Sequence, residues 1–208
     1  VDVAIIGFVE MLQEKKIEGK DSISTLLTAV RREDGSYQIL CKVGGGVSFD
    51  QRIDFYNLLQ PDIVESDYRY TKSDGRAFRF VEPKYVIQMK YNDLIEYDAT
   101  GMHVKQMVLN YDSNGKKWNP VKMANFVSII APRFELLRTE VNLEDYPSLE
   151  YANPKSVDVQ EISIDQILDV TYIEAPTVVE TEDLPKSEIA IRLAFEGDWR
   201  GDLSAKKI

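Results

Sequence analysis

The chain has 208 residues, of which 44% are hydrophobic, so it can bury the core of one ordinary domain with an appendage, or of two small domains. Its net charge of −10 argues against a free-standing nucleic-acid-binding protein, because neutralising phosphates requires a basic surface. No apolar run approaches the roughly 20 residues of a membrane helix, and the single cysteine, Cys41, excludes an internal disulfide and fits a reducing cytoplasm.

The charge is unevenly distributed along the chain. Residues 147–208 contain 13 acidic and 6 basic side chains, whereas residues 1–146 contain 22 acidic and 19 basic ones. The first part is nearly balanced and can present a basic face, which the acidic last part cannot. One cysteine and one histidine cannot build a Cys/His zinc site, and we predict no metal site in this chain.

The chain opens with a predicted strand. The run Val3–Met11 is almost continuously apolar, which is typical of a buried strand, and Gly7 within it indicates a bulge or a close approach of another backbone. The polar loop Leu12–Ser22 follows, and it is either simply solvated or able to contact phosphate groups. The lysines of this loop are Lys15, Lys16 and Lys20.

Two β-rich runs come next and form a predicted hairpin. They are Ile23–Arg31 and Tyr37–Val43, and the Asp34-Gly35 pair between them is the strongest short hairpin signal in the chain. We therefore expect three strands before the chain reaches a glycine-rich turn.

The glycine-rich turn, Gly44–Gly46, connects the third predicted strand to a helix. Glycine accepts positive φ and allows a close approach to the backbone. The segment is therefore either an ordinary turn between a strand and a helix or a place where another molecule contacts the main chain. The helix is expected to start at Ser48, which forms a capping-box pattern with Gln51, and to end before Pro61. The residues expected on its apolar face are Phe49, Ile53, Tyr56 and Leu59.

The order of these elements predicts the fold. Strand, loop, strand, turn, strand, glycine turn and helix is the order of a small Greek-key barrel with a helix at one end, as in OB-folds. Further strands are predicted on both sides of a turn at Asp112–Gly115. They are Tyr85–Tyr91, Asp93–Tyr97, His103–Leu109 and Ala124–Arg138, the last one broken at Pro132. We predict a mainly β protein with an OB-type barrel and one capping helix.

Four aromatic residues alternate in the long polar connection after the helix. They are Tyr68, Tyr70, Phe78 and Phe80. Such residues either pack into the core or form a platform on which bases stack, and the alternation is more typical of core packing. Trp118, beside the predicted turn, is expected to be buried or half-buried, and the alternative is a stacking or groove role together with Lys116 and Lys117.

Four segments of the chain, taken in order, carry a resemblance to a known family. They are VDVAIIGFVE, ISTLLTAVRREDGSYQILCKVGGGVSFDQRIDFYNLL, VEPKYVIQMKYNDLI and IIAPRFELLR. They resemble the C-terminal OB-fold domain of ATP-dependent DNA ligases, in which a VDLVVIG-type strand opens the domain, a KVGTGF-type turn precedes the helix, a WxxP segment precedes an EV-type strand, and an RFPRF-x-R-x-R motif closes the domain. The resemblance covers about residues 1–145 and implies the same fold.

The resemblance also implies a role for the closing motif. In that family, its basic groups orient the β- and γ-phosphates of ATP while a lysine of the neighbouring nucleotidyltransferase domain attacks the α-phosphate. Arg133 and Arg138 match the motif. Arginine suits the role because its planar guanidinium makes bidentate contacts with phosphate.

The closing motif of this chain departs from the family pattern. Ile130 and Leu136 stand where the family has arginines, and Val141 stands where it has a lysine. Either Lys122 or Lys105 compensates, or the domain orients ATP weakly, or it only clamps DNA.

The same resemblance implies contacts with the phosphates and the minor groove of nicked duplex DNA. Lysine side chains and backbone amides would make these contacts. The residues are Lys15, Lys16, Lys20, Lys42, Gly44, Gly45 and Gly46. ATP and Mg²⁺ would act through the parent enzyme and would not be bound by this domain alone.

The segment Lys72–Arg76 (KSDGR) contains the KxDG pattern that surrounds the adenylated lysine of the nucleotidyltransferase domain. In the family this pattern follows a buried strand and precedes further motifs, and neither condition holds here. We therefore interpret the segment as a turn between strands, and we do not expect this chain to seal DNA alone.

We expect an OB-fold domain at residues 1–145 and a small acidic α+β extension of undefined role at residues 146–208. The resemblance implies the C-terminal part of a cytoplasmic ATP-dependent DNA ligase of repair or replication, preceded by the nucleotidyltransferase domain and hinged near Val1 and Asp2. Three alternatives stay open. They are a non-catalytic OB module for single strands, a protein-interaction domain, and the equivalent domain of an RNA ligase or capping enzyme.

Overall fold

The structure, a computed structural model, describes residues 1–16 and 19–150, so most of the predicted acidic extension lies outside the described residues. Two short 3-10 helices (Gln13–Lys15 and Gln60–Asp62) and one α-helix, α1 (Phe49–Leu59), occur in this range. The strands are β1 (Asp2–Glu10), β2 (Ile23–Arg31), β3 (Tyr37–Val43), β4 (Glu65–Ser66), β5 (Arg79–Phe80), β6 (Val86–Lys90), β7 (Asp93–Ile95), β8 (Lys105–Asp112), β9 (Lys117–Asn125), β10 (Ser128–Ile130) and β11 (Arg133–Leu137). None of these helices is long and apolar enough to cross a membrane.

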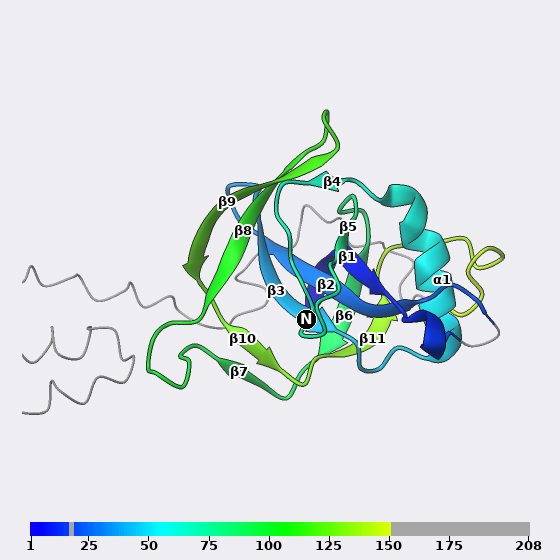
Figure 1. Ribbon diagram of the computed structural model, residues 1–208, viewed down its shortest axis with the longest axis horizontal. Coiled ribbons are helices and arrows are strands. Elements are labelled where there is room, and N and C mark those ends of the chain that lie inside the picture. The colour runs from blue at the N-terminus through cyan, green and yellow to red at the C-terminus, as the bar shows by residue number, and fades with distance from the viewer. Residues whose placement is uncertain (17–18, 151–208) are drawn as a thin grey trace, which may run out of the picture. The chain divides into compact units, whose positions relative to one another are not determined.

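One curled sheet contains most of the strands, in the order β11-β6-β1-β2-β3-β8-β9-β4, with β5 paired to β1 (Figure 1). Strands β1, β2, β3, β6 and β11 follow the Greek-key order of an OB-fold. The sheet curls until the segment after β3 meets β11, where Gly45 and Arg133 form a parallel bridge. There the Phe134 amide donates to the Gly45 carbonyl over 2.9 Å. The predicted OB-type barrel is confirmed.

The bulge predicted at Gly7 is present in β1. The register with β2 shifts between Ile5 and Gly7. Gly7 also pairs with Phe80 of β5, and a Cβ atom at position 7 would lie 2.7 Å from the Arg79 carbonyl oxygen. Any side chain there would push β5 away from β1, which explains why glycine occupies this position.

The helix begins as predicted. Ser48 caps α1, because its Oγ accepts a hydrogen bond from the Gln51 amide over 3.2 Å and its amide donates to the Gln51 side chain over 2.9 Å. The helix ends at Leu59, and Pro61 stands in the 3-10 turn that follows. Local signals were therefore sufficient to place both ends of α1.

The buried face of α1 differs from the predicted stripe. The structure buries Phe55 and Leu58 together with Leu59, whereas the other predicted positions are only half-buried. Phe55 packs edge-on against Phe134 of β11, with ring centroids 5.3 Å apart. The helix sequence contains two overlapping apolar stripes, and periodicity alone does not decide which one faces the sheet.

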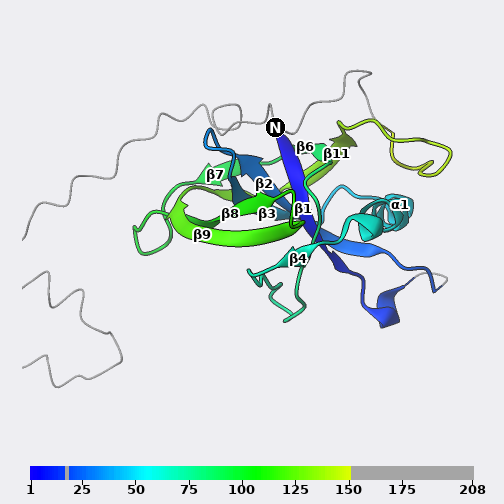
Figure 2. The same cartoon turned by 90° about the horizontal axis from the view of Figure 1, so that it is seen from above.

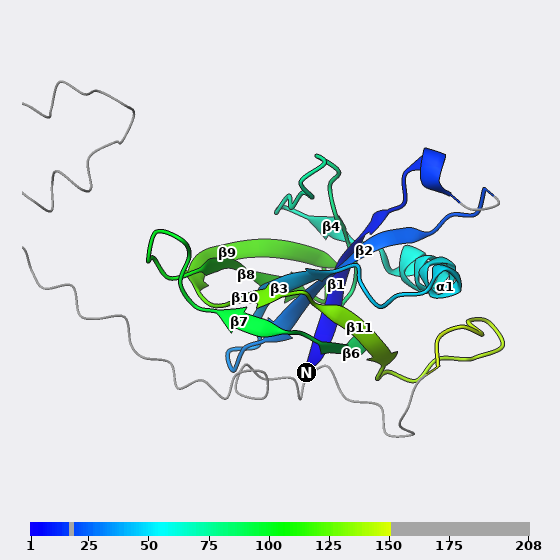
Figure 3. The same ribbon diagram turned by 90° about the horizontal axis from the view of Figure 1, so that it is seen from below.

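The β8–β9 hairpin extends the sheet beyond the barrel, and Figures 2 and 3 show it at the opposite end from α1. It joins the barrel through β3, where Tyr37 pairs with Leu109 and Gln38 with Val108. The sequence does not predict β9, because Pro120 has no amide to donate. The structure places Pro120 beside a register irregularity, where a missing donor is tolerated.

Trp118 fills the space between this hairpin and the barrel. It is fully buried, and its Nε1–H donates to the Val81 carbonyl over 2.9 Å. Its ring lies 5.2 Å from Tyr37 and 6.3 Å from Phe80, centroid to centroid. The predicted burial of Trp118 is confirmed, and so is the core-packing interpretation for Phe78 and Phe80, which are both buried.

Candidate phosphate-binding surface

Arg133 stands at the start of β11 with an exposed side chain. It lies directly opposite Lys90 in the pairing of β11 with β6, and the Lys90 ammonium makes an ion pair with Glu135. The Arg133 guanidinium itself makes no hydrogen bond or ion pair with any described residue. Because Glu135 offsets the charge of Lys90, Arg133 is the cation of this pair that is left to bind an anion.

Arg138 follows β11 and is already engaged. Its Nε lies 3.3 Å from a carboxylate oxygen of Asp2, an ion pair without the alignment of a hydrogen bond. Its amide donates to the Val86 carbonyl over 2.9 Å. Five residues of strand separate it from Arg133, roughly 15 Å at the rise of a β-strand. The structure therefore does not bring the two predicted arginines together.

The glycine turn serves the closure of the barrel. Gly46 has a φ of +79°, and a Cβ atom there would overlap the Phe134 carbonyl oxygen. Gly45 bridges Arg133, and the Gly44 carbonyl accepts a hydrogen bond from the Arg52 guanidinium over 2.5 Å. Backbone packing explains Gly46, whereas a Cβ atom at Gly44 or Gly45 would meet its nearest neighbours at 3.5 and 3.4 Å. The contact of the turn's amides with DNA stays a prediction.

Lys42, the remaining predicted residue of this region, precedes the turn at the end of β3. Its side chain is half-buried, and its Nζ lies over the Tyr70 ring, 4.9 Å from the centroid. Among the described residues no carboxylate lies within ion-pair distance of it.

The three lysines of the first loop do not form one patch. Lys15 is exposed at the end of a 3-10 helix, whereas Lys16 makes an ion pair with Asp21 and keeps only 8% of its side chain exposed. Lys20 is exposed and reaches toward α1.

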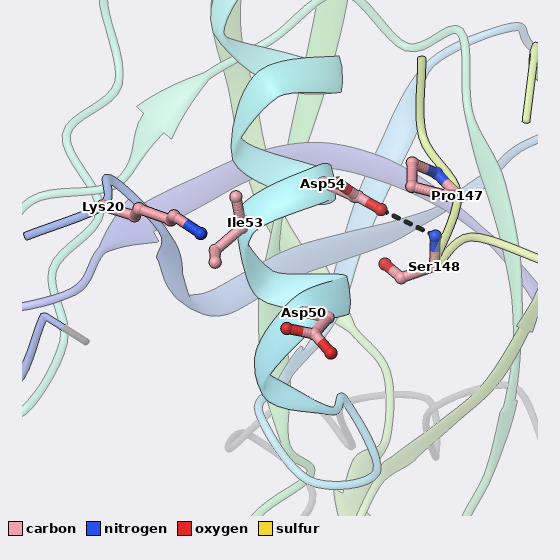
Figure 4. A pocket seen from close by; sticks show the side chains of 6 residues that line it. All are labelled: Lys20, Asp50, Ile53, Asp54, Pro147 and Ser148. Carbon is pink, nitrogen blue, oxygen red and sulfur yellow. Dashed lines mark hydrogen bonds between the residues drawn. The ribbon is translucent and has the colours of Figure 1, made fainter. Parts of the chain in front are cut away.

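Lys20 lines a pocket of about 480 Å³ between α1 and the segment that follows β11 (Figure 4). The Asp54 carboxylate accepts a hydrogen bond from the Ser148 amide over 2.8 Å and so ties this segment to the helix. The lining residues are Lys20, Asp50, Ile53, Asp54, Pro147 and Ser148. Two carboxylates in so small a space oppose phosphate, so the pocket fits a structural role better than an anion site. In the part of the chain that the structure describes, no cluster of three or more metal-ligating side chains occurs.

The KSDGR segment is a turn, as interpreted. The Lys72 amide donates to the Arg76 carbonyl and the Gly75 amide donates to the Lys72 carbonyl, both over 2.9 Å. Thr71 and Ala77 form an antiparallel bridge beside it. Lys72 therefore sits on a short hairpin and does not occupy the position of an adenylated lysine after a buried strand.

The chain's only cysteine is a packing residue. Its thiol lies 3.7 Å from the Met89 sulfur, and burial raises the pKa of Cys41 to about 11. The thiolate is therefore essentially absent near neutral pH, which excludes Cys41 as a nucleophile.

Sequence reasoning missed Lys90, the lysine that the structure pairs with Arg133. The compensating lysines proposed from the sequence, Lys105 and Lys122, lie instead on β8 and β9. The pairing of β6 with β11 is a long-range contact, and no local pattern in the sequence reveals which residue of β6 stands opposite Arg133.

Comparison with known proteins adds an independent line of evidence. The sequence profile described as "ATP dependent DNA ligase C terminal region" matches residues 19–140. The ligase domain of M. tuberculosis LigD matches with 15% identity and a TM-score of 0.40, over 77% of this chain and 36% of that chain. A mycobacterial DNA ligase D complexed with ATP and MES matches with 18% identity and a TM-score of 0.33, over 58% and 33%. Curated protein sequences give no match.

The chain thus spans about a third of the length of these two ligases. The profile match covers more than half of the chain and includes the glycine turn, Arg133 and Arg138. The barrel topology agrees with the fold that the four matching segments imply. The chain belongs to the family of C-terminal regions of ATP-dependent DNA ligases.

Proposed function

We propose that this domain orients the β- and γ-phosphates of ATP while a lysine of a neighbouring nucleotidyltransferase domain is adenylated, and that it then clamps nicked duplex DNA. The family assignment supports a place in such an enzyme. The observation that carries the ATP role is the state of Arg133, which is exposed, lies beside Lys90 and has no partner among the described residues.

The chemistry of the first step needs such cations. The lysine nitrogen attacks the α-phosphate, and the bond to pyrophosphate breaks as the lysine–AMP bond forms. The leaving pyrophosphate must be held in line with the attack, and its negative charge must be offset. A guanidinium meets both needs through bidentate hydrogen bonds.

Arg138, unlike Arg133, is already paired with a carboxylate. Its ion pair with Asp2 has to open before the guanidinium can reach a phosphate. Asp2 is the first residue of β1, close to the hinge expected between the domains. We therefore assign Arg138 a secondary role, coupled to the movement of the domain between an ATP-bound closed state and a DNA-bound state.

In the later steps AMP passes to the 5′-phosphate of the nick, and the 3′-hydroxyl then attacks that phosphate and releases AMP. Mg²⁺ would be held with the catalytic domain and would offset phosphate charge during both transfers. This domain would contribute cations that grip the DNA backbone while the nick is sealed.

The test is made in the complete enzyme that contains this domain. Lysine–AMP formation from ATP and sealing of a pre-adenylated nick are measured for the wild type and for Arg133→Ala, Arg138→Ala and the distal control Lys116→Ala. We expect Arg133→Ala to slow adduct formation roughly tenfold or more, with a smaller effect for Arg138→Ala and none for the control. Sealing of the pre-adenylated nick should persist in all three variants.

Two results would overturn this assignment. Adduct formation unimpaired in Arg133→Ala would remove the ATP-orienting role. A wild-type enzyme that forms no adduct would favour a domain that only binds nucleic acid or another protein.

A further inference from the structure

We propose that Lys42, Tyr70 and Lys72 form a second phosphate-binding site, which receives a backbone phosphodiester of the bound DNA. The inference deepens the DNA-clamping part of the proposed function and rests on it. Two of these residues, Tyr70 and Lys72, belong to the hairpin between α1 and β5, which the sequence analysis interpreted only as a turn with core-packing aromatics.

Three separate elements bring the site together. Lys72 donates a hydrogen bond from its Nζ to the Ser24 hydroxyl over 3.0 Å, which anchors the hairpin to the start of β2. Lys42, at the end of β3, places its Nζ 4.9 Å from the Tyr70 ring centroid. Tyr70 and Lys72 are two residues apart on an extended hairpin arm, so their side chains point to the same side, roughly 7 Å apart. Lys42 therefore lies over the Tyr70 ring, and Lys72 follows that ring by two residues with its ammonium on the Ser24 hydroxyl.

The positive charge at this site has no counter-charge in contact with it. Both lysines are half-buried, and in residues 1–16 and 19–150 neither makes an ion pair with a carboxylate. Arg52 lies beside them and donates to the carbonyls of Ser24 and Gly44 over 2.6 and 2.5 Å. Both side chains stay partly exposed, so an anion can reach them and form charge-assisted hydrogen bonds.

The surroundings of the Lys72 ammonium support the same conclusion. Burial lowers the pKa of Lys72, and the charges of Arg76, Arg52 and Lys15 lower it further. Asp74 opposes this effect, and its carboxylate is paired with the Arg76 guanidinium over 3.0 and 2.5 Å, so these two charges largely cancel. The charges of Arg52 and Lys15 are left to act on Lys72. The electrostatic field at Lys72 is therefore positive, in a chain whose net charge is −10.

The aromatic side of the site favours a polynucleotide over a free anion. Tyr68 and Tyr70 are half-buried and stacked, with ring centroids 6.1 Å apart and an interplanar angle of 27°. A flat aromatic surface next to two ammonium groups suits a phosphate that carries a sugar and a base. The site also adjoins the glycine turn, because Lys42 precedes Gly44 by two residues and Arg52 binds the Gly44 carbonyl.

The test uses the complete enzyme that contains this domain and fluorescence anisotropy with a labelled nicked duplex over a series of salt concentrations. We expect Lys42→Gln and Lys72→Gln each to weaken binding roughly 3–10-fold and to reduce the slope of log K against log salt by about 0.9. Lys72→Arg keeps the charge and should bind like the wild type. The matched control is Lys116→Gln, which removes an exposed lysine from the β8–β9 turn and should change neither quantity.

The outcomes of this experiment distinguish failure of the proposed function from failure of the phosphate-binding site. A complete enzyme with the wild-type domain that does not bind the duplex at low salt would overturn the DNA-clamping function itself. Normal binding by folded Lys42→Gln and Lys72→Gln, with circular dichroism spectra and melting temperatures like those of the wild type, would overturn this site and leave the proposed function standing.

Competitors identify the source of the phosphate. Inorganic phosphate or ATP could displace the duplex at equal phosphate concentration, and this effect could be lost in Lys72→Gln. That result would show that the site binds a free anion, and it would contradict the proposal that the ligand is a polynucleotide. Equal displacement by polyglutamate would show a general cationic surface and overturn the proposal. We expect neither competitor to match single-stranded or duplex DNA.

Discussion

The sheet ends differently on its two sides, at β11 and at β9. At the closed end, β3 and β11 meet through Gly45 and Arg133, and α1 packs over them. At the open end, β9 pairs with β4 at Lys117 and Trp118 only, as far as the described residues show. The side chains of Val121 and Met123 on β9 are 54% and 51% exposed. The closed end fixes cations at defined positions by backbone contact, whereas the open end joins the barrel through the short β3–β8 pairing and a buried indole.

The largest effect is expected at the closed end, from Gly46→Ala. Gly46 and Gly101 both have φ near +80°, but a Cβ atom at Gly46 overlaps the Phe134 carbonyl, and at Gly101 it meets nothing within 4 Å. We expect Gly46→Ala to lower the free energy of unfolding by about 3 kcal/mol or more, and Gly101→Ala by about 1 kcal/mol. Urea unfolding of both variants measures the difference. Equal losses would show that the closed end tolerates a side chain at the turn.

The next effect tests the open end. Trp118→Phe removes the hydrogen bond to the Val81 carbonyl and part of a fully buried ring. We expect a loss of about 2 kcal/mol in the free energy of unfolding, because a buried carbonyl is left without a donor and a small cavity opens.

Tyr111→Phe is the matched control for Trp118. Its ring lies 5.0 Å from that of Trp118, and its buried hydroxyl has no hydrogen-bond partner among the described residues. We therefore expect Tyr111→Phe to be neutral or slightly stabilising. Thermal unfolding of both variants checks this, and a neutral Trp118→Phe would mean that the hairpin is held mainly elsewhere.

A smaller effect is expected at Asp2. Asp2→Asn removes the charge that pairs with Arg138, and the two side chains are 28% and 21% exposed. Solvent screens a pair exposed to this degree, so we expect a loss of only about 0.5–1 kcal/mol. The loss should shrink at high salt, and a loss that does not depend on salt in urea unfolding would point to packing and not to charge.

The smallest effect concerns the titration of Lys72. Its pKa in the folded chain is below the ordinary value of 10.5, so between the two values the unfolded chain binds more protons. The contribution of Lys72 to stability therefore rises with pH through this window. Site-specific NMR titration should show the lowered pKa, and binding of an oligonucleotide should raise it. A pKa unchanged by the oligonucleotide would contradict a phosphate contact at Lys72.

Much of the closed end could be predicted from local signals. The Asp34-Gly35 turn, the bulge at Gly7 and the capping box at Ser48 each depend on residues near one another in the chain, and each is present. The open end could not be predicted as well, because β9 contains Pro120 and has strand character only through its pairing with β8.

The candidate site was predictable in part. Arg133 follows from the resemblance of one motif, but its neighbour Lys90 depends on the register between β6 and β11. The group of Lys42, Tyr70 and Lys72 depends on a hairpin that folds back onto β2 and β3. Pairing of distant segments is a property of the folded chain, and a single sequence does not reveal it.

The bridge between Gly45 and Arg133 ties the position of Arg133, which we propose contacts ATP, to the glycine turn. The backbone that carries the guanidinium is hydrogen-bonded to the turn itself, so the length of the turn sets where the guanidinium stands. Inserting one glycine there would shift Arg133 without replacing any side chain of the domain. The rate of lysine adenylation would then depend on the length of a turn that lies far from Arg133 in the sequence. A change in the turn would therefore require a compensating change near the arginine.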